Sequence, residues 1–246
     1  MANPTLNTNF IDNSFNSLGN ELVMSSNGVI LKTSLLLMFL ALPFAYVWQL
    51  VMTGFSDKAN LLGMFGLIAG FVMAIIICFA PKNKFLIIST PLYAMCEGLA
   101  LGFISAIVNK AYPGIASQAA IGTVLSAFTM LLLYKTNIIK CNDKFRAVIL
   151  NATISIAILY LAQFLLNLFH LNFLNILFSS NPIGIGFSIF VVILASLNLI
   201  IDFDNITRFS GKVDKNYEWY FGFSLLVTLV WLYIEIINLL AKLQRR

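Results

Sequence analysis

The sequence predicts an all-α integral membrane protein, a bundle of seven transmembrane helices. Of its 246 residues, 60% are apolar and 10% are charged, against about 25% charged residues in an ordinary soluble domain. Seven apolar blocks of about 20 residues, the length that crosses a bilayer, are separated by short polar segments. The net charge of +5 is small, and the basic residues lie between the blocks, which fits anchoring at lipid headgroups and excludes nucleic acid as a partner.

Each apolar block is long enough to span the membrane as a helix. In chain order the blocks cover residues 30–52, 61–80, 85–108, 115–134, 147–169, 183–201 and 219–241. Turn-forming residues separate the first six of them: Gly54, Pro81, Pro113 with Gly114, Asn142, and Pro182. In the third block, small residues recur at four-residue spacing (Ala94, Gly98, Gly102, Ala106), a pattern that lets helices pack closely in lipid.

The first 29 residues form a polar, asparagine-rich tail. They include Asp12 and Glu21 but no Lys or Arg, so the charged region of a cleavable signal peptide is missing. We therefore expect the first block to be kept as a membrane span. The chain then divides into a tail, residues 1–29, and a seven-helix membrane domain, residues 30–246.

The basic residues predict the orientation of the bundle. With seven spans, ten of the 15 Lys and Arg side chains fall on the side of the N-terminus and five on the other side. Because cytoplasmic loops carry the excess of Lys and Arg, the N-terminus is predicted to be cytoplasmic. A re-entrant last segment would move the C-terminal basic residues to the cytoplasmic side as well, and this alternative stays open.

Acidic residues inside the membrane are the candidate functional groups. Glu97 and Glu235 lie within apolar blocks, and Asp202 and Asp204 close the sixth block. A charged carboxylate at the centre of a bilayer costs about 2.5 to 3.5 kcal/mol on insertion scales. Glu97, close to the midplane of its block, could be a protonated acid bonded to a neighbouring helix, and Asp204 could mark only the headgroup level. The functional alternative is a set of carboxylates along an ion path.

Amide side chains accompany these carboxylates. If the sixth helix continues, Asn198, Asp202 and Asn205 share one face, and Glu235 and Asn238 are three residues apart in the last block. Two carboxyl groups forced together in a low dielectric share a proton and titrate jointly, which makes a pH sensor. Calcium prefers 6 to 8 oxygen ligands, so Asp202 and Glu235 with these amides predict a weak, transient calcium site and no other cofactor.

Three segments resemble the closing signature of the Bax inhibitor-1 family (transmembrane Bax inhibitor motif proteins), most nearly its bacterial, YccA-like branch. These are IDFDNI at 201–206, YEWY at 217–220 and LVWLYIEII at 229–237. The segments 2–4 and 28–33, with Glu97, Gly98 and Gly102, are also similar to that branch. The resemblance implies a location in the bacterial inner membrane and a last helix that is central, wrapped by the other six.

The same resemblance implies a pH-dependent calcium leak controlled by an acidic pair. Asp202 matches the family's aspartate before the last connection, and Glu235 matches the acidic residue of the last helix, with glutamate in place of aspartate. In a simple hairpin, the helical rise places these two residues about 20 Å apart in depth, whereas Glu97 and Glu235 match in depth. No arginine lies in the interior of a block to hold a carboxylate.

Two functions are consistent with the sequence. The first is a pH-responsive calcium or cation leak through the bilayer. The second is a non-conducting regulator that binds a membrane protease or another integral protein. We expect no enzyme, because the single histidine, His170, lies at a block boundary and no GxSxG motif is present.

Overall fold

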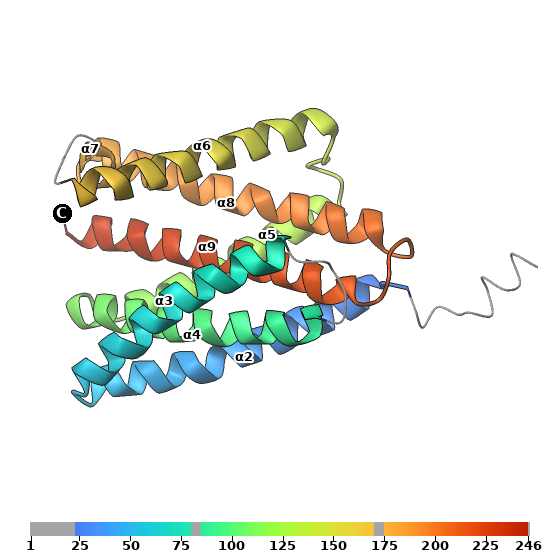
Figure 1. The fold of residues 1–246 in the computed structure, drawn as a ribbon. Helices are drawn as coiled ribbons and strands as arrows, with labels where there is room; N and C mark the ends of the chain where they lie inside the picture. The colour runs from blue at the N-terminus through green and yellow to red at the C-terminus, as the bar shows by residue number, and fades with distance from the viewer. Residues whose placement is uncertain (1–22, 80–84, 170–174, 246) are drawn as a thin grey trace, which may run out of the picture.

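The computed structural model describes residues 23–79, 85–169 and 175–245, and these form a helical bundle (Figure 1). Its helices are α2 (Ser26–Met52), α3 (Ser56–Phe79), α4 (Phe85–Ala111), α5 (Ile115–Lys135), α6 (Asp143–Leu168), α7 (Asn175–Phe178), α8 (Pro182–Phe209) and α9 (Tyr217–Gln244). All except the short α7 are long and apolar enough to cross a membrane. This confirms the predicted all-α membrane bundle. The tail residues 1–22 and His170 lie outside the described residues.

Local signals in the sequence set the helix boundaries. The side chains of Ser25 and Asn142 accept hydrogen bonds from the first turns of α2 and α6, which satisfies backbone groups that have no partner within the helix. Gly114, with φ of +88°, precedes α5. The first span begins at Ser26, four residues before the predicted position, and α8 continues eight residues beyond the predicted end at 201.

Helix α9 lies in the middle of the bundle, red in Figure 1. It packs against α2, α4, α5 and α8, whereas α3 packs mainly on α4 and α6 packs on α8. The expected central position of the last helix is therefore observed, but four helices surround it closely rather than six. Helices α4 and α8 are even more buried than α9.

The small residues of α4 bring two helices into close contact, as predicted. A side chain at Gly98 would come within 2.2 Å of the carbonyl oxygen of Leu40, and one at Gly102 within 2.5 Å of that of Phe44. Leu40 and Phe44 are one turn apart on α2, so these glycines let the backbone of α4 lie directly on α2.

The last helix runs from one end of the bundle to the other. At its start, Glu218 bonds to Ser25 at the beginning of α2. Near its end, Lys242 bonds to Leu177 and Gly184, at α7 and the beginning of α8. α9 is thus one uninterrupted helix of 28 residues, and the re-entrant alternative is wrong because such a segment would return to the end at which it started.

Candidate functional site

A row of polar side chains runs along the contacts of α8 with α9 and α6. We call it the polar seam. From the end of the bundle where α6 begins to the end where α7 lies, it comprises Asp204, Asp202 with Ser224 and Thr228, Asn198 with Thr153, Glu235 with Tyr160 and Trp231, and Lys242 with Ser188. Its members on α8 extend from Ser188 to Asp204, about 24 Å at the helical rise, which approaches the 30 Å of a hydrocarbon core.

Asp202 is buried between α8 and α9, with 8% of its surface exposed. Ser224 donates to its Oδ1 at 2.9 Å and Thr228 to its Oδ2 at 2.6 Å. Ser224 and Thr228 are one turn apart on α9, so both hydroxyls reach the same carboxyl group. Asp202 is held by two neutral donors, neither of which is among the predicted site residues.

Glu235 is more deeply buried, with 3% exposure. Its Oε1 accepts a hydrogen bond from the hydroxyl of Tyr160 on α6 at 2.7 Å and one from the indole nitrogen of Trp231 at 3.1 Å. These donors are also neutral. Glu235 therefore links α9 to α6, which makes few backbone contacts with α9.

Asp202 and Glu235 do not form the predicted pair. Among the residues that the structure describes, no hydrogen bond joins any two of the carboxyl groups of Glu97, Asp202 and Glu235. Thr228, which bonds to Asp202, precedes Glu235 by seven residues, or about 10 Å along α9. The two carboxyls thus sit at different depths of one seam, closer than the predicted 20 Å but too far apart to share a proton.

Glu97 lies outside the polar seam. It is half-buried on α4, beside Tyr93, and its Oε2 would come within 3.1 Å of a side chain at Gly70 on α3. Ser105 lies eight residues after Glu97 on α4, and its hydroxyl bonds to the hydroxyl of Tyr233 on α9. Because Tyr233 and Glu235 point about 200° apart on α9, Glu235 faces away from α4, and the alternative pair of Glu97 with Glu235 is wrong.

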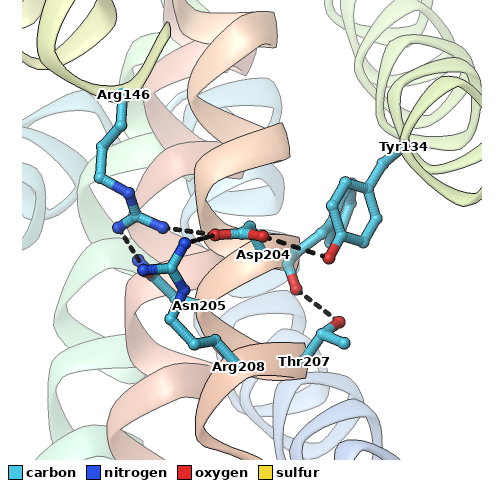
Figure 2. Close-up of polar contacts among 7 residues, drawn as sticks. Tyr134, Arg146, Asp204, Asn205, Thr207 and Arg208 are labelled. Carbon is cyan, nitrogen blue, oxygen red and sulfur yellow. Dashed lines mark hydrogen bonds and ion pairs between the residues drawn. The ribbon is translucent and has the colours of Figure 1, made fainter. Parts of the chain in front are cut away.

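Asp204 and Asn205 belong to a charged cluster at the end of the bundle where α6 begins (Figure 2). Arg146, in the first turn of α6, donates to Asp204 at 2.5 Å and to Asn205 at 2.6 Å. Arg208, one turn after Asp204, lies 3.3 Å from the same carboxylate. Tyr134 of α5 approaches from the other side at 3.4 Å. Asp204 therefore joins three helices rather than marking the headgroup level alone.

Arg146 is a partner for a carboxylate, although no arginine lies in the interior of a predicted block. It lies one residue before the fifth predicted block, but α6 begins at Asp143 and so includes it. Cys141 lies beside this cluster, just before α6. Burial raises the pKa of its thiol, Asp204 raises it further, and Arg146 acts in the opposite direction.

The predicted amide residues have different surroundings. Asn198 is half-buried and donates to the hydroxyl of Thr153 on α6 at 2.8 Å, which places it in the polar seam. Asn238 is exposed and does not share the buried environment of Glu235. In this structure Asn238 therefore does not join Glu235 in the buried site that the sequence predicts.

The spacing on α9 could have revealed the seam. Its polar members Ser224, Thr228, Trp231, Glu235 and Lys242 follow one another at intervals of four, three, four and seven residues, which places them on one helical face. Lys242 follows directly after the last predicted block, which ends at 241. Two hydroxyl residues four apart in an apolar block, Ser224 and Thr228, are the sequence signal for this polar face.

The seam offers a cation few oxygen ligands at any one point. Among the described residues, no three Asp, Glu, His or Cys side chains gather as a metal site, and the oxygens around Asp202 come from one carboxylate and two hydroxyls. Calcium prefers 6 to 8 oxygens. Two hollows of about 390 Å³ lie elsewhere, one lined by α2, α4, α5 and α9 and the other by α2, α3 and α4, and both are almost wholly apolar.

The structure also brings two distant sequence segments together. Glu218, with 2% exposure, accepts hydrogen bonds from the backbone nitrogen and the hydroxyl of Ser25, both at 3.1 Å. A side chain at Gly28 would overlap its carboxylate. Next to this contact, the ammonium of Lys32 lies over the ring of Trp219. The segments 28–33 and 217–220 thus form one contact between the start of α2 and the start of α9.

Comparison with known proteins identifies the family. No curated protein and no solved structure gives a match. A family model described as Bax inhibitor 1 like matches residues 3–245, which is nearly the whole chain and includes all seven spans. Of the segments that carry the resemblance, 28–33 and 217–220 lie together at the starts of α2 and α9, and 201–206 and 229–237 supply acids of the polar seam. The chain belongs to the Bax inhibitor 1 like family.

Proposed function

We propose that this membrane protein is a pH-responsive cation leak, that calcium is a cation it passes, and that the polar seam is the path. One observation carries the proposal: two buried carboxyl groups, Asp202 and Glu235, lie at different depths of one polar row that crosses most of the bundle. Ionisable groups at such depth are costly and typically mark ion or proton pathways.

The two carboxyls act as separate titrating groups rather than as one proton-sharing pair. Their partners are hydroxyl and indole groups without charge, so protonation and ionisation change the net charge of the seam directly. When they are ionised, Asp202 and Glu235 provide two negatively charged groups that can bind a cation, about two helical turns apart. Protonated, they offer only neutral oxygens.

In the present arrangement the seam is filled by side chains that bond to one another. Passage of an ion therefore requires the hydrogen bonds of Asp202 with α9 and of Glu235 with α6 to break. Loss of a proton or arrival of a cation changes the strength of these bonds, which gives a physical link between pH and conduction.

Calcium flux from liposomes tests the proposal. The purified protein is reconstituted with a calcium indicator trapped inside, and flux is measured between pH 5 and 8. In D202N and E235Q we expect a flux lower by about tenfold, the effect of losing about 1.4 kcal/mol of interaction with a charged group, and a flatter pH profile.

E97Q is the matched control, since Glu97 is a half-buried carboxyl outside the seam, and it should conduct and respond to pH like the wild type. If all three variants behave alike, the seam is not the path. A bilayer without flux, combined with a membrane protease that co-purifies with the protein, would favour the regulatory alternative.

A further inference from the structure

The side chain of Lys242 is half-buried and hydrogen-bonded to protein oxygens at the end of the bundle where α7 lies. Its Nζ donates to the carbonyl oxygens of Leu177 at 3.2 Å and Gly184 at 3.1 Å, and to the hydroxyl of Ser188 at 2.8 Å. A lysine ammonium has three donors, and all three have an oxygen partner here. The ammonium thus fills a site made of three neutral oxygens.

This position is unusual for a lysine near the end of a transmembrane helix. Such side chains normally extend to the interface, where the ammonium is hydrated. At the same end of the bundle, Lys58, Lys110 and Arg245 are exposed and follow that rule. Lys242 instead turns inward, toward α7 and the first turns of α8.

The backbone at the junction of α7 and α8 is arranged to present oxygens. A side chain at Gly184 would come within 2.1 Å of the carbonyl oxygen of Ser179, so glycine lets the end of α7 fold tightly against α8. Ser188 follows Gly184 by one turn and adds its hydroxyl on the same side. Uncharged carbonyl and hydroxyl oxygens in a compact group are ligands that hard cations prefer.

We propose that the oxygens of Leu177, Gly184 and Ser188 form a binding site for a small cation, and that Lys242 occupies it as a tethered cation. The site lies at one mouth of the polar seam, since Lys242 follows Glu235 by two helical turns on the same face and interacts with it electrostatically. Lys242 would then compete with any free cation for this mouth. The site goes beyond the proposed leak, and its occupancy can be tested without measuring conduction.

Replacement of the tethered cation by a free one tests the site. In K242A the three oxygens lose their partner and a space opens beside them. The purified variant is heated in detergent with methylammonium, potassium or calcium chloride, and with tetramethylammonium chloride at matched ionic strength. We expect methylammonium or a metal ion to raise the Tm of K242A saturably by about 4 °C, and tetramethylammonium, which is large and has no N–H group, to leave it unchanged.

Wild type and K110A provide the comparison. Lysine fills the site in the wild type, and K110A removes an exposed lysine at the same end of the bundle, so neither should show the saturable shift. If K242A responds to all four salts as K110A does, the site does not exist. Should K242A not survive purification, recovery of folded protein in each salt replaces Tm: recovery with methylammonium or a metal ion supports the site, and failure in every salt contradicts it.

Discussion

The carboxylate of Glu218 occupies the space that a side chain at position 28 would fill, and this position is a glycine. The carboxylate lies at the first turn of α2, where the backbone N–H groups have no helical partner and where negative charge is favoured by the helix dipole. Ser25 donates both its hydroxyl and its backbone N–H to this one group. A single carboxylate thereby ties the beginning of the first span to the beginning of the last.

The substitution G28A should destabilise the protein because its methyl group would lie 1.9 Å from Oε1 of Glu218. Overpacking of this kind costs about 1 to 3 kcal/mol, and each kcal/mol lowers the Tm of a chain of this size by about 2 to 4 °C. Thermal unfolding in detergent measures the effect.

Gly186 provides the matched control, since it also lies in a helix but a side chain there meets nothing within 4 Å. G186A should leave the Tm unchanged or raise it slightly, because alanine favours helix over glycine. In the E218A background, G28A should lower the Tm much less than it does in the wild type, because the carboxylate that it would overlap is gone. A Tm for G28A equal to that of G186A would show that the carboxylate moves aside freely.

Among the helices, α6 depends most on a few polar contacts. Its main packing partner is α8. Its outer face is largely exposed in the absence of lipid. Arg146 fastens its first turn to Asp204 and Asn205, Thr153 bonds to Asn198, and Tyr160 bonds to Glu235. Polar bonds can hold a helix in this way because hydrocarbon provides no hydrophobic drive for helix association.

The two arginines that share Asp204 should differ in importance. R146M removes bonds that cross from α6 to α8, so we expect a loss of about 1 to 3 kcal/mol in the free energy of unfolding. R208M removes a contact within α8 from a side chain that is 48% exposed, and contacts of that kind contribute about 0.3 to 0.5 kcal/mol. Unfolding by heat in detergent compares the two, and equal effects would mean that Arg146 does not hold α6.

The whole molecule has two unlike ends. One carries the cluster around Asp204, the contact of Glu218 with α2, and most of the basic side chains, and the other carries α7 and the half-buried Lys242 with its three oxygen partners. The seam joins these ends. The charge distribution predicts that the end with Arg146 faces the cytoplasm.

Labelling of Cys141 tests this orientation. The described cysteines are Cys78, Cys96 and Cys141, and in a C78A C96A background only Cys141 remains to react with a membrane-impermeant maleimide. It should be labelled in sealed inside-out vesicles and protected in right-side-out vesicles. The reverse pattern would place the N-terminus outside.

The pH profile of the same reaction reports on Asp204. Burial and the nearby carboxylate raise the pKa of Cys141, and the thiolate is the reactive form, so labelling should accelerate at a higher pH than for an ordinary cysteine. D204N removes the second cause and should shift the midpoint of the profile to lower pH. An unchanged midpoint would show that the charge of Asp204 does not affect the pKa of the Cys141 thiol.

The sequence by itself determined the spans, the membrane class, the close packing of α4 and the candidate acids Asp202 and Glu235. These follow from features that act locally or along one helix, such as apolar length, glycine spacing and the cost of a charge in lipid. Asn238 is exposed, and the predicted sharing of a proton by Asp202 and Glu235 was wrong, because the relative height of two helices, which the sequence pattern leaves free, decides which side chains meet.

Only the tertiary structure decided the partners of each acid. Ser224, Thr228 and Tyr160 are ordinary residues in apolar blocks until the packing of α6, α8 and α9 aligns them with Asp202 and Glu235. The same packing gave Arg146 and Lys242, two basic residues near the ends of spans, hydrogen-bond partners on neighbouring helices. A hydrogen bond acts over about 3 Å, so its partner is fixed by where whole helices come to rest.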